Sequence, residues 1–222
     1  MDQNVLDRYN TTKVAEDYKN EYQRKLHRKI SDRLERRIFK NYFEIIGRID
    51  SLLDIPCGAG RLFPLFREYS KNIIEADFSM PMLILSRRDN NYMANLYLRC
   101  NALNIPFLDY SIDCVVSIRL NHHIEVVEER KKHLEECFRV AKKAVIVTWF
   151  SHYSFRALSR RIRARLGFKK REKYTLKTSE VKKLAEVNGF KMVKAKPLTP
   201  LQLGSSHIFG LFLREDKSSE KK

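Results

Sequence analysis

The sequence contains no apolar run of about 18 residues, so it predicts no transmembrane helix. The N-terminus, MDQNVLDRYN, carries acids and no apolar stretch, unlike a secretory signal. The four cysteines are scattered, with neither a CxxC pair nor a metal-ligand spacing. We therefore expect buried free thiols in a reducing compartment, no bound metal, and a cytoplasmic protein.

Internal repeats and Pro/Gly/Ser-rich linkers are also absent, so no domain boundary is visible. With 222 residues, of which 43% are hydrophobic, the chain fits one domain with a full-sized core. We expect a single domain over residues 1–214 and a disordered tail over residues 215–222. Within this domain, residues 1–47 form an N-terminal helical cap, and residues 151–175 form a basic insertion after the fifth strand.

The formal net charge of +17 is concentrated in two stretches. Residues 24–40 contain eight Lys or Arg against two acids, and residues 151–175 contain nine against one. Together these blocks supply +14 of the total, so the excess is local. A diffuse excess would indicate solubility alone, whereas two blocks favour an anionic substrate or partner.

Strand-like and helical segments alternate along most of the chain. Residues 51–55, 73–78, 95–100, 114–118 and 144–150 are strand-like, and residues 61–69, 81–92 and 126–140 between them are helical. This alternation predicts right-handed βαβ units and a parallel sheet. Residues 190–195 and 207–213 can add an antiparallel pair at one edge. The sequence thus predicts an α/β fold, with a doubly wound, mostly parallel seven-stranded sheet and an antiparallel C-terminal strand.

Two further helices flank this pattern. Residues 14–46 have helical periodicity, with an apolar residue at every fourth position and basic residues between, and Gly47 as the expected end. The apolar positions are Tyr22, Leu26, Ile30, Leu34 and Ile38. Near the C-terminus, Thr178 or Ser179 is the expected N-cap of a helix through Val187.

A glycine turn and an acid mark a candidate ligand site. Gly58 and Gly60 follow the first strand, where doubly wound folds bind nucleotide-like ligands. Asp77 ends the second strand 17 residues further on, where a carboxylate can accept both hydroxyls of a ribose. NAD requires a phosphate cradle of the GxGxxG type, but here Pro56 stands two residues before Gly58 and no third glycine follows. The turn therefore favours S-adenosylmethionine, which has no phosphate.

The segments DIPCGAG, EADFSMPML, NALNIPFLDYSIDCVVS, LNHH and ECFRVAKKAVIVTWF occur in this order. Over roughly residues 9–149, this set resembles class I S-adenosylmethionine-dependent methyltransferases with a type 11/25-like domain. The resemblance implies S-adenosylmethionine as cofactor and S-adenosylhomocysteine as product. It places Asp54, Pro56, Gly58 and Gly60 around the methionine moiety, Asp77 on the ribose, Phe78, Met82, Asn101 and Ala102 near the adenine, and Leu120 beside the sulfonium. Pro56 replaces a glycine of the family pattern, and Asn101 replaces an acid.

Methyl transfer from a sulfonium depends mainly on alignment and desolvation. His122 and His123, which follow the fourth strand, are candidate bases for the acceptor, with a packing role as the alternative. Tyr9 and Tyr18 belong to a segment that folds over the cofactor in similar enzymes. Arg61 either meets the methionine carboxylate or covers the edge of the sheet.

The resemblance implies that both basic blocks lie over the mouth of the active site. Residues 154–166 are amphipathic, which suits a lid, a helix on an anionic membrane or a surface that follows phosphates. Their candidate substrate-binding residues are Arg156, Arg160, Arg161, Arg163 and Arg165. We expect a methyltransferase for an anionic small molecule, glycan or lipid. A tRNA or rRNA methyltransferase and a non-catalytic S-adenosylmethionine-binding partner protein are the alternatives, and the inner membrane surface is the alternative location.

Overall fold

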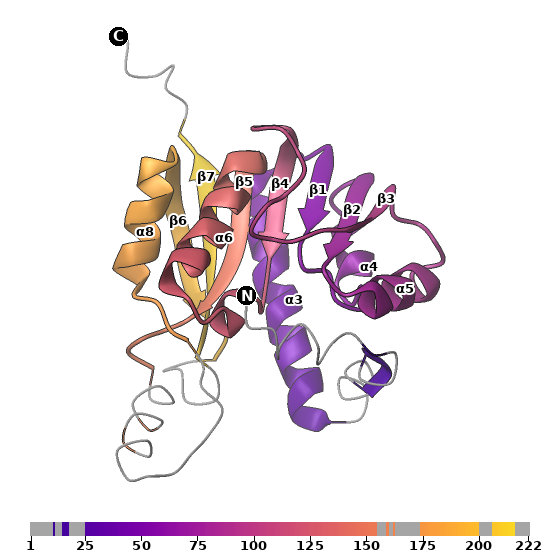
Figure 1. Cartoon of the computed structure of the whole chain (residues 1–222), viewed down its shortest axis with the longest axis horizontal. Helices are drawn as coiled ribbons and strands as arrows, with labels where there is room; N and C mark the ends of the chain where they lie inside the picture. The colour runs from indigo at the N-terminus through magenta and orange to yellow at the C-terminus, as the bar shows by residue number, and fades with distance from the viewer. Residues whose placement is uncertain are drawn as a thin grey trace.

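The structure of the protein is a computed structural model. It describes Thr11, residues 15–17 and 25–154, Ser159, Ile162, and residues 174–199 and 206–215. Seven strands form one sheet in the order β3-β2-β1-β4-β5-β7-β6 (Figure 1). The strands are β1 (Ser51–Asp54), β2 (Asn72–Asp77), β3 (Leu96–Arg99), β4 (Ile112–Ser117), β5 (Ala141–Phe150), β6 (Phe190–Pro197) and β7 (His207–Arg214). The named helices are α3 (Leu26–Ile46), α4 (Phe63–Phe66), α5 (Met80–Asp89), α6 (Val127–Val140) and α8 (Thr178–Val187), with a short 3₁₀ turn, η1, at Asn121–His123.

The sheet topology confirms the predicted fold. Strands β3, β2, β1, β4 and β5 are mutually parallel, whereas β7 lies antiparallel between β5 and β6. The chain runs from β1 outward to β2 and β3, and then returns to β4 on the other side of β1. In a doubly wound sheet such a reversal leaves a crevice at the carboxyl ends of the two central strands. Here the reversal lies between β1 and β4, which predicts a ligand crevice at their carboxyl ends.

Helices cover both faces of the sheet (Figure 1). Helices α6 and α8 pack on one face through residues such as Leu134, Phe138 and Val181. Helices α3 and α4 pack on the opposite face, where Phe39 and Phe66 belong to the second core cluster. The most apolar segment, β5, lies inside the sheet as its composition predicts, whereas the edge strand β6 exposes most of its length.

Helix α3 differs from the prediction in its start and in the direction of its apolar stripe. It begins at Leu26 with Lys25 as N-cap, and it ends at Gly47 as expected. Leu26 and Ile30 are exposed, whereas Ile38 is buried. A repeat of four residues turns about 40° beyond one full turn of a helix with 3.6 residues per turn. The stripe therefore winds around the helix, and only its C-terminal end reaches the sheet.

Two smaller predictions can also be compared with the structure. Lys177, not Thr178 or Ser179, is the N-cap of α8, and its backbone N–H donates to the Glu180 carboxylate at 3.1 Å. All four cysteines are free, and three are buried as predicted, whereas Cys100 is half-buried. Several predictions concern residues that lie outside the described part of the chain. These residues are Tyr9, Tyr18, Arg156, Arg160, Arg161, Arg163 and Arg165, and residues 216–222 of the expected tail.

Candidate cofactor site

Asp54 and Asp77 both lie at the crevice, because β1 and β2 are parallel and each strand ends at one of them. Asp54 is buried, and its Oδ1 has no hydrogen-bond partner among the described residues. Burial, followed by the nearby Glu75 carboxylate, raises the pKa of Asp54 well above its usual range. A buried acceptor without a partner is costly, so this oxygen fits a ligand that brings a hydrogen-bond donor or a positive charge.

Asp77 organises the turns on either side of it. Its Oδ2 accepts the backbone N–H of Gly58 at 2.9 Å, and its Oδ1 accepts that of Ser79 at 2.8 Å. Burial raises the pKa of Asp77 to about 6, although these backbone donors lower it. Each carboxylate oxygen has a second lone pair, so both oxygens can still accept the hydroxyls of a ribose.

The glycine turn rests on a buried polar chain that sequence reasoning missed. Asn90 donates to the carbonyl of Gly60 at 3.1 Å and to Ser86 Oγ at 3.3 Å, and Ser86 Oγ donates to Glu75. A Cβ on Gly60 would lie 2.2 Å from both Asn90 Nδ2 and Ser86 Oγ. Burial raises the pKa of Glu75 to about 7, although the Ser86 hydrogen bond lowers it. This chain therefore fixes the turn from below, and it requires glycine at position 60.

Gly58 and Pro56 form the upper part of the same turn. Gly58 has a φ of +57°, and a Cβ there would meet no atom within 4 Å. The backbone is therefore open above Gly58, as close approach of a ligand requires. Pro56 follows Ile55 through a cis peptide bond, and the next residue, Cys57, donates its N–H to the Ala76 carbonyl at 2.9 Å. The turn is thus tied to both β1 and β2.

The residues predicted near the adenine lie at the ends of β2 and β3. Phe78 is half-buried, and the Arg99 guanidinium lies over its ring, 5.4 Å from the centroid. Met82 is buried on α5. Asn101 is exposed, and its Oδ1 accepts the backbone N–H of Leu103 at 3.0 Å, while Ala102 is buried. Leu120 is buried at the start of η1. The roles of these residues toward the adenine and the sulfonium stay predictions.

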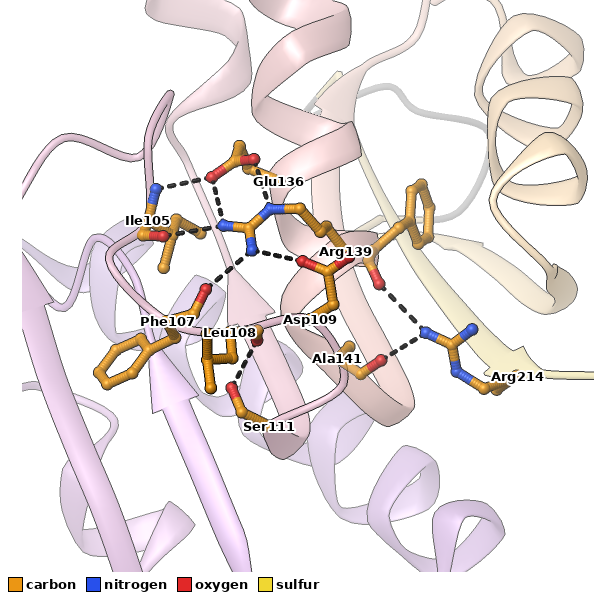
Figure 2. Close-up of polar contacts among 10 residues, drawn as sticks. Ile105, Phe107, Leu108, Asp109, Ser111, Glu136, Arg139, Ala141 and Arg214 are labelled. Carbon is orange, nitrogen blue, oxygen red and sulfur yellow. Dashed lines mark hydrogen bonds and ion pairs between the residues drawn. The ribbon is translucent and has the colours of Figure 1, made fainter.

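The loop that carries Asn101 and Ala102 is held by Arg139 on α6 (Figure 2). The Arg139 guanidinium donates to the backbone carbonyls of Ile105 and Phe107, each at 2.8 Å. It also pairs with Asp109 at 2.8 Å and Glu136 at 2.7 Å. Glu136 in turn accepts the N–H of Ile105 at 2.7 Å. One arginine therefore fixes the course of this loop.

A second arginine network joins α3 to the crevice. Glu35 on α3 is fully buried and pairs with Arg61, at 2.6 Å, and with Arg119, which follows β4. Arg61 also pairs with Asp32, and its carbonyl accepts a hydrogen bond from Arg36 at 2.8 Å. Burial alone would raise the pKa of Glu35, but the two guanidiniums outweigh it and lower this pKa below its usual value. Arg61 thus lies beside the glycine turn, in contact with two acids of α3.

The two candidate bases lie in η1, close to the end of β4. The His122 ring stacks on Phe150 with centroids 3.9 Å apart, and it meets His207 edge-on at 5.2 Å. His122 is buried and His123 is half-buried. The stacking gives His122 a packing role, and the role of either ring as a base stays a prediction.

A third histidine, which sequence reasoning missed, supports η1 from below. His133 on α6 is fully buried, and burial lowers its pKa to about 4. The Asn121 side chain donates to its Nδ1 at 3.2 Å, so its Nε2 carries the proton and donates to Ser117 Oγ at 2.8 Å. This neutral histidine links the end of β4 to η1.

The strand order, the antiparallel β7 and the crevice define the fold of class I methyltransferases. Residues 53–148 match the family of methyltransferase domains, and this stretch includes Asp54, Gly58, Gly60 and Asp77. A methyltransferase domain therefore spans residues 53–148, and the chain has the fold of class I S-adenosylmethionine-dependent methyltransferases.

Known proteins agree with this class and differ in what they methylate. The chain is 30% identical over 109 residues to a demethylmenaquinone methyltransferase of Renibacterium salmoninarum, covering 47% of this chain and 43% of that protein. A demethylmenaquinone methyltransferase of Paenarthrobacter aurescens is 33% identical over 107 residues, or 46% of this chain and 39% of that protein. The chain thus spans less than half the length of these curated relatives. In structure, the chain is similar to magnesium protoporphyrin IX methyltransferase of Synechocystis PCC 6803, solved with bound S-adenosylhomocysteine. The TM-score is 0.77 at 15% sequence identity, and the match covers 97% of this chain and 100% of that chain.

Several of the missed residues had a signal in the sequence. Glu75 is an acid within an otherwise apolar strand, two residues before Asp77 and therefore on the same face. Glu35 is one of two acids in the basic block over residues 24–40. Arg119 and His133 had no comparable signal, because their partners come from distant parts of the chain.

Proposed function

We propose that the chain transfers the methyl group of S-adenosylmethionine to an anionic small molecule, glycan or lipid. One observation carries this proposal: the first basic block, on α3, and the start of the second, at Ser151, adjoin the edge of the sheet that holds Asp54 and Asp77. The first block forms the N-terminal part of α3, whose acids contact Arg61 and Arg119 at this edge. The second block begins directly after Phe150, the last residue of β5, which is parallel to β4 and ends at the same edge.

S-adenosylmethionine supplies an electrophilic methyl group on a sulfonium, so the chemical demand on the protein is small. Asp77 and the turn around Gly58 would bind the cofactor, and Asp54 offers a buried acceptor to its cationic part. Leu120 and the core beneath it exclude water from the centre of the crevice. His122 or His123 would accept the proton of an oxygen or nitrogen acceptor.

The direct test incubates the protein with cell extract and S-adenosylmethionine labelled in the methyl group. The extract is then separated into lipid, glycan, small-molecule and RNA fractions. We expect label in a lipid, glycan or anionic small-molecule fraction, and none with the Asp77→Ala variant. Label in RNA alone would contradict the proposed acceptor, and an unlabelled extract would contradict the proposed activity.

A further inference from the structure

The outward face of α3 exposes two aliphatic side chains near the start of the helix. Leu26 is 72% exposed and Ile30 is 50% exposed. They lie one turn apart, on the side opposite the buried Phe39 and Tyr42. The relative burial of these residues shows that this part of the helix projects away from the core. Two large aliphatic side chains held in water are unfavourable unless another surface covers them.

A row of basic residues runs beside this aliphatic pair. Lys29, Arg33 and Arg37 are spaced four residues apart, so they share one side of the helix, and all three are exposed. In the part of the chain that the structure describes, none of the three has an ion-pair partner. The neighbouring acids Asp32 and Glu35 are already paired with Arg36, Arg61 and Arg119. This face therefore carries an uncompensated positive charge.

This arrangement does not serve the stability of the helix. The first turn of α3 contains no acid, and its N-cap, Lys25, makes no side-chain capping hydrogen bond. A basic side chain beside the first turn, as Lys29 is, opposes the helix dipole, an effect that fades beyond that turn. An external anionic surface would remove that cost, and it would satisfy the positive row at the same time.

The face also has a defined position relative to the cofactor site. The pairs from Glu35 to Arg61 and Arg119 hold the middle of α3 against the glycine turn and the end of β4. In Figure 1 the N-terminal turns of α3 continue past the edge of the sheet where β1, β2 and β4 end. A surface that bound Leu26 and Ile30 would therefore lie beside the mouth of the crevice.

We propose that this outward face of α3, formed by Leu26, Lys29, Ile30, Arg33 and Arg37, docks on an anionic lipid bilayer. The two aliphatic side chains enter the boundary between headgroups and acyl chains, and the basic row meets the lipid phosphates. Long basic side chains suit this position because their methylene stems lie along apolar surface while their charges stay in water. A nucleic acid would meet the same charges, but single-stranded RNA binds through aromatic stacking, which Leu26 and Ile30 do not provide. Docking does not depend on the acceptor, so it can be tested apart from methyl transfer.

The test is co-sedimentation of the full chain with vesicles of phosphatidylcholine alone and with 30% phosphatidylglycerol. Two double variants address the two components of the face: Leu26→Glu with Ile30→Glu, and Arg33→Glu with Arg37→Glu. Matched controls make equivalent double changes on exposed residues elsewhere: Val187→Glu on α8 with Val193→Glu on β6, and Lys191→Glu with Lys194→Glu on the edge strand β6. Circular dichroism and S-adenosylhomocysteine binding confirm that each variant is folded.

We expect the wild-type protein to bind the anionic vesicles, and more weakly as salt rises from about 50 to 300 mM, since screening acts over about 8–10 Å. The Arg33→Glu and Arg37→Glu variant should reduce binding at least about tenfold, because each basic residue near the surface contributes roughly a factor of five. The Leu26→Glu and Ile30→Glu variant should reduce it by a similar factor, because it removes both apolar side chains and adds two charges of the same sign as the lipids. The controls should reduce it less than about threefold. The proposal would be overturned if the wild-type protein did not bind anionic vesicles, or if the control variants lost as much vesicle binding as the α3 variants. So would tighter binding to RNA that is lost with Arg33 and Arg37 but not with Leu26 and Ile30, because that pattern indicates a phosphate-binding surface.

Discussion

At Gly60, both the backbone conformation and the surrounding atoms disfavour any side chain. Its φ is +67°, and a Cβ would lie 2.2 Å from Ser86 Oγ and Asn90 Nδ2, which hold the turn. We expect Gly60→Ala to lower the free energy of unfolding by about 2 kcal/mol or more, and to weaken S-adenosylhomocysteine binding at least about tenfold. Gly47→Ala is the matched control, because Gly47 has a φ of +74° with no atom near its Cβ position. Equal losses in the two variants, measured by urea unfolding and calorimetry, would show that the close contact at Gly60 is unimportant.

Three buried carboxyls at the crevice should make cofactor binding dependent on pH. Burial raises the pKa of Asp77 to about 6 and that of Glu75 to about 7, and it raises that of Asp54 as well. We expect the affinity for S-adenosylmethionine to rise at least about threefold between pH 5.5 and 7.5, as Asp77 and Glu75 ionise and attract the sulfonium. Calorimetry across this range checks it, with Asp77→Asn as the variant in which the rise is smaller. An affinity that does not change with pH in the wild type would contradict the proposed role of these carboxyls.

The same groups act on the stability of the protein without ligand. Since the pKa of Glu75 in the folded protein lies above the ordinary value of 4.5, the folded state holds more protons between about pH 4.5 and 7. Stability should therefore decrease as the pH rises through this range, and Glu75→Gln should remove part of that decrease. Thermal unfolding at pH 5 and pH 7 measures the difference, which should amount to a few degrees. The opposite slope in the wild type would show that Glu75 is ionised in the folded protein.

At the scale of single elements, the loop after β3 depends on Arg139. This side chain forms charged hydrogen bonds to the Ile105 and Phe107 carbonyls, and these are among the stronger hydrogen bonds in proteins. We expect Arg139→Met to destabilise the protein by about 2 kcal/mol and to weaken cofactor binding, because the loop carries the predicted adenine contacts. Lys131→Met changes an exposed residue of the same helix and serves as the control. If urea unfolding and calorimetry gave the two variants the same values, Arg139 would not hold the loop.

Helix α3 is joined to the cofactor site by Glu35. Removing this carboxylate leaves Arg61 and Arg119 without their shared partner, and breaking a buried pair typically costs about 3–5 kcal/mol. We expect Glu35→Ala to destabilise the protein by about 3 kcal/mol at pH 7, as measured by urea unfolding. Because the pKa of Glu35 is lowered on folding, its contribution is complete above about pH 4.5 and is lost as the pH falls further. The difference between wild type and variant should therefore shrink below pH 4.5, and a difference independent of pH would contradict the ion pair.

For the whole molecule, the sequence predicts local periodicity better than long-range contacts. The five parallel strands and the antiparallel pair were visible because each strand is a short apolar run between turns. The four-residue stripe of α3 was visible too, but its direction was not, because the drift of about 40° per step matters only once one end of the helix is packed. The turn residues Gly58 and Gly60 could be predicted from backbone chemistry. Arg119 and His133 could not, because their contacts join α3, β4 and α6 across the fold.

The central claim is that the crevice between β1, β2 and β4 binds S-adenosylmethionine through Asp77. The most direct measurement is calorimetric titration of S-adenosylhomocysteine into the wild-type protein and into Asp77→Ala. The wild type should bind in the micromolar range, and the variant should bind more weakly by about 2 kcal/mol or more, because the ribose loses charged hydrogen bonds. Absence of heat with the wild type, tighter binding of NAD(H), or unchanged affinity in Asp77→Ala would contradict it.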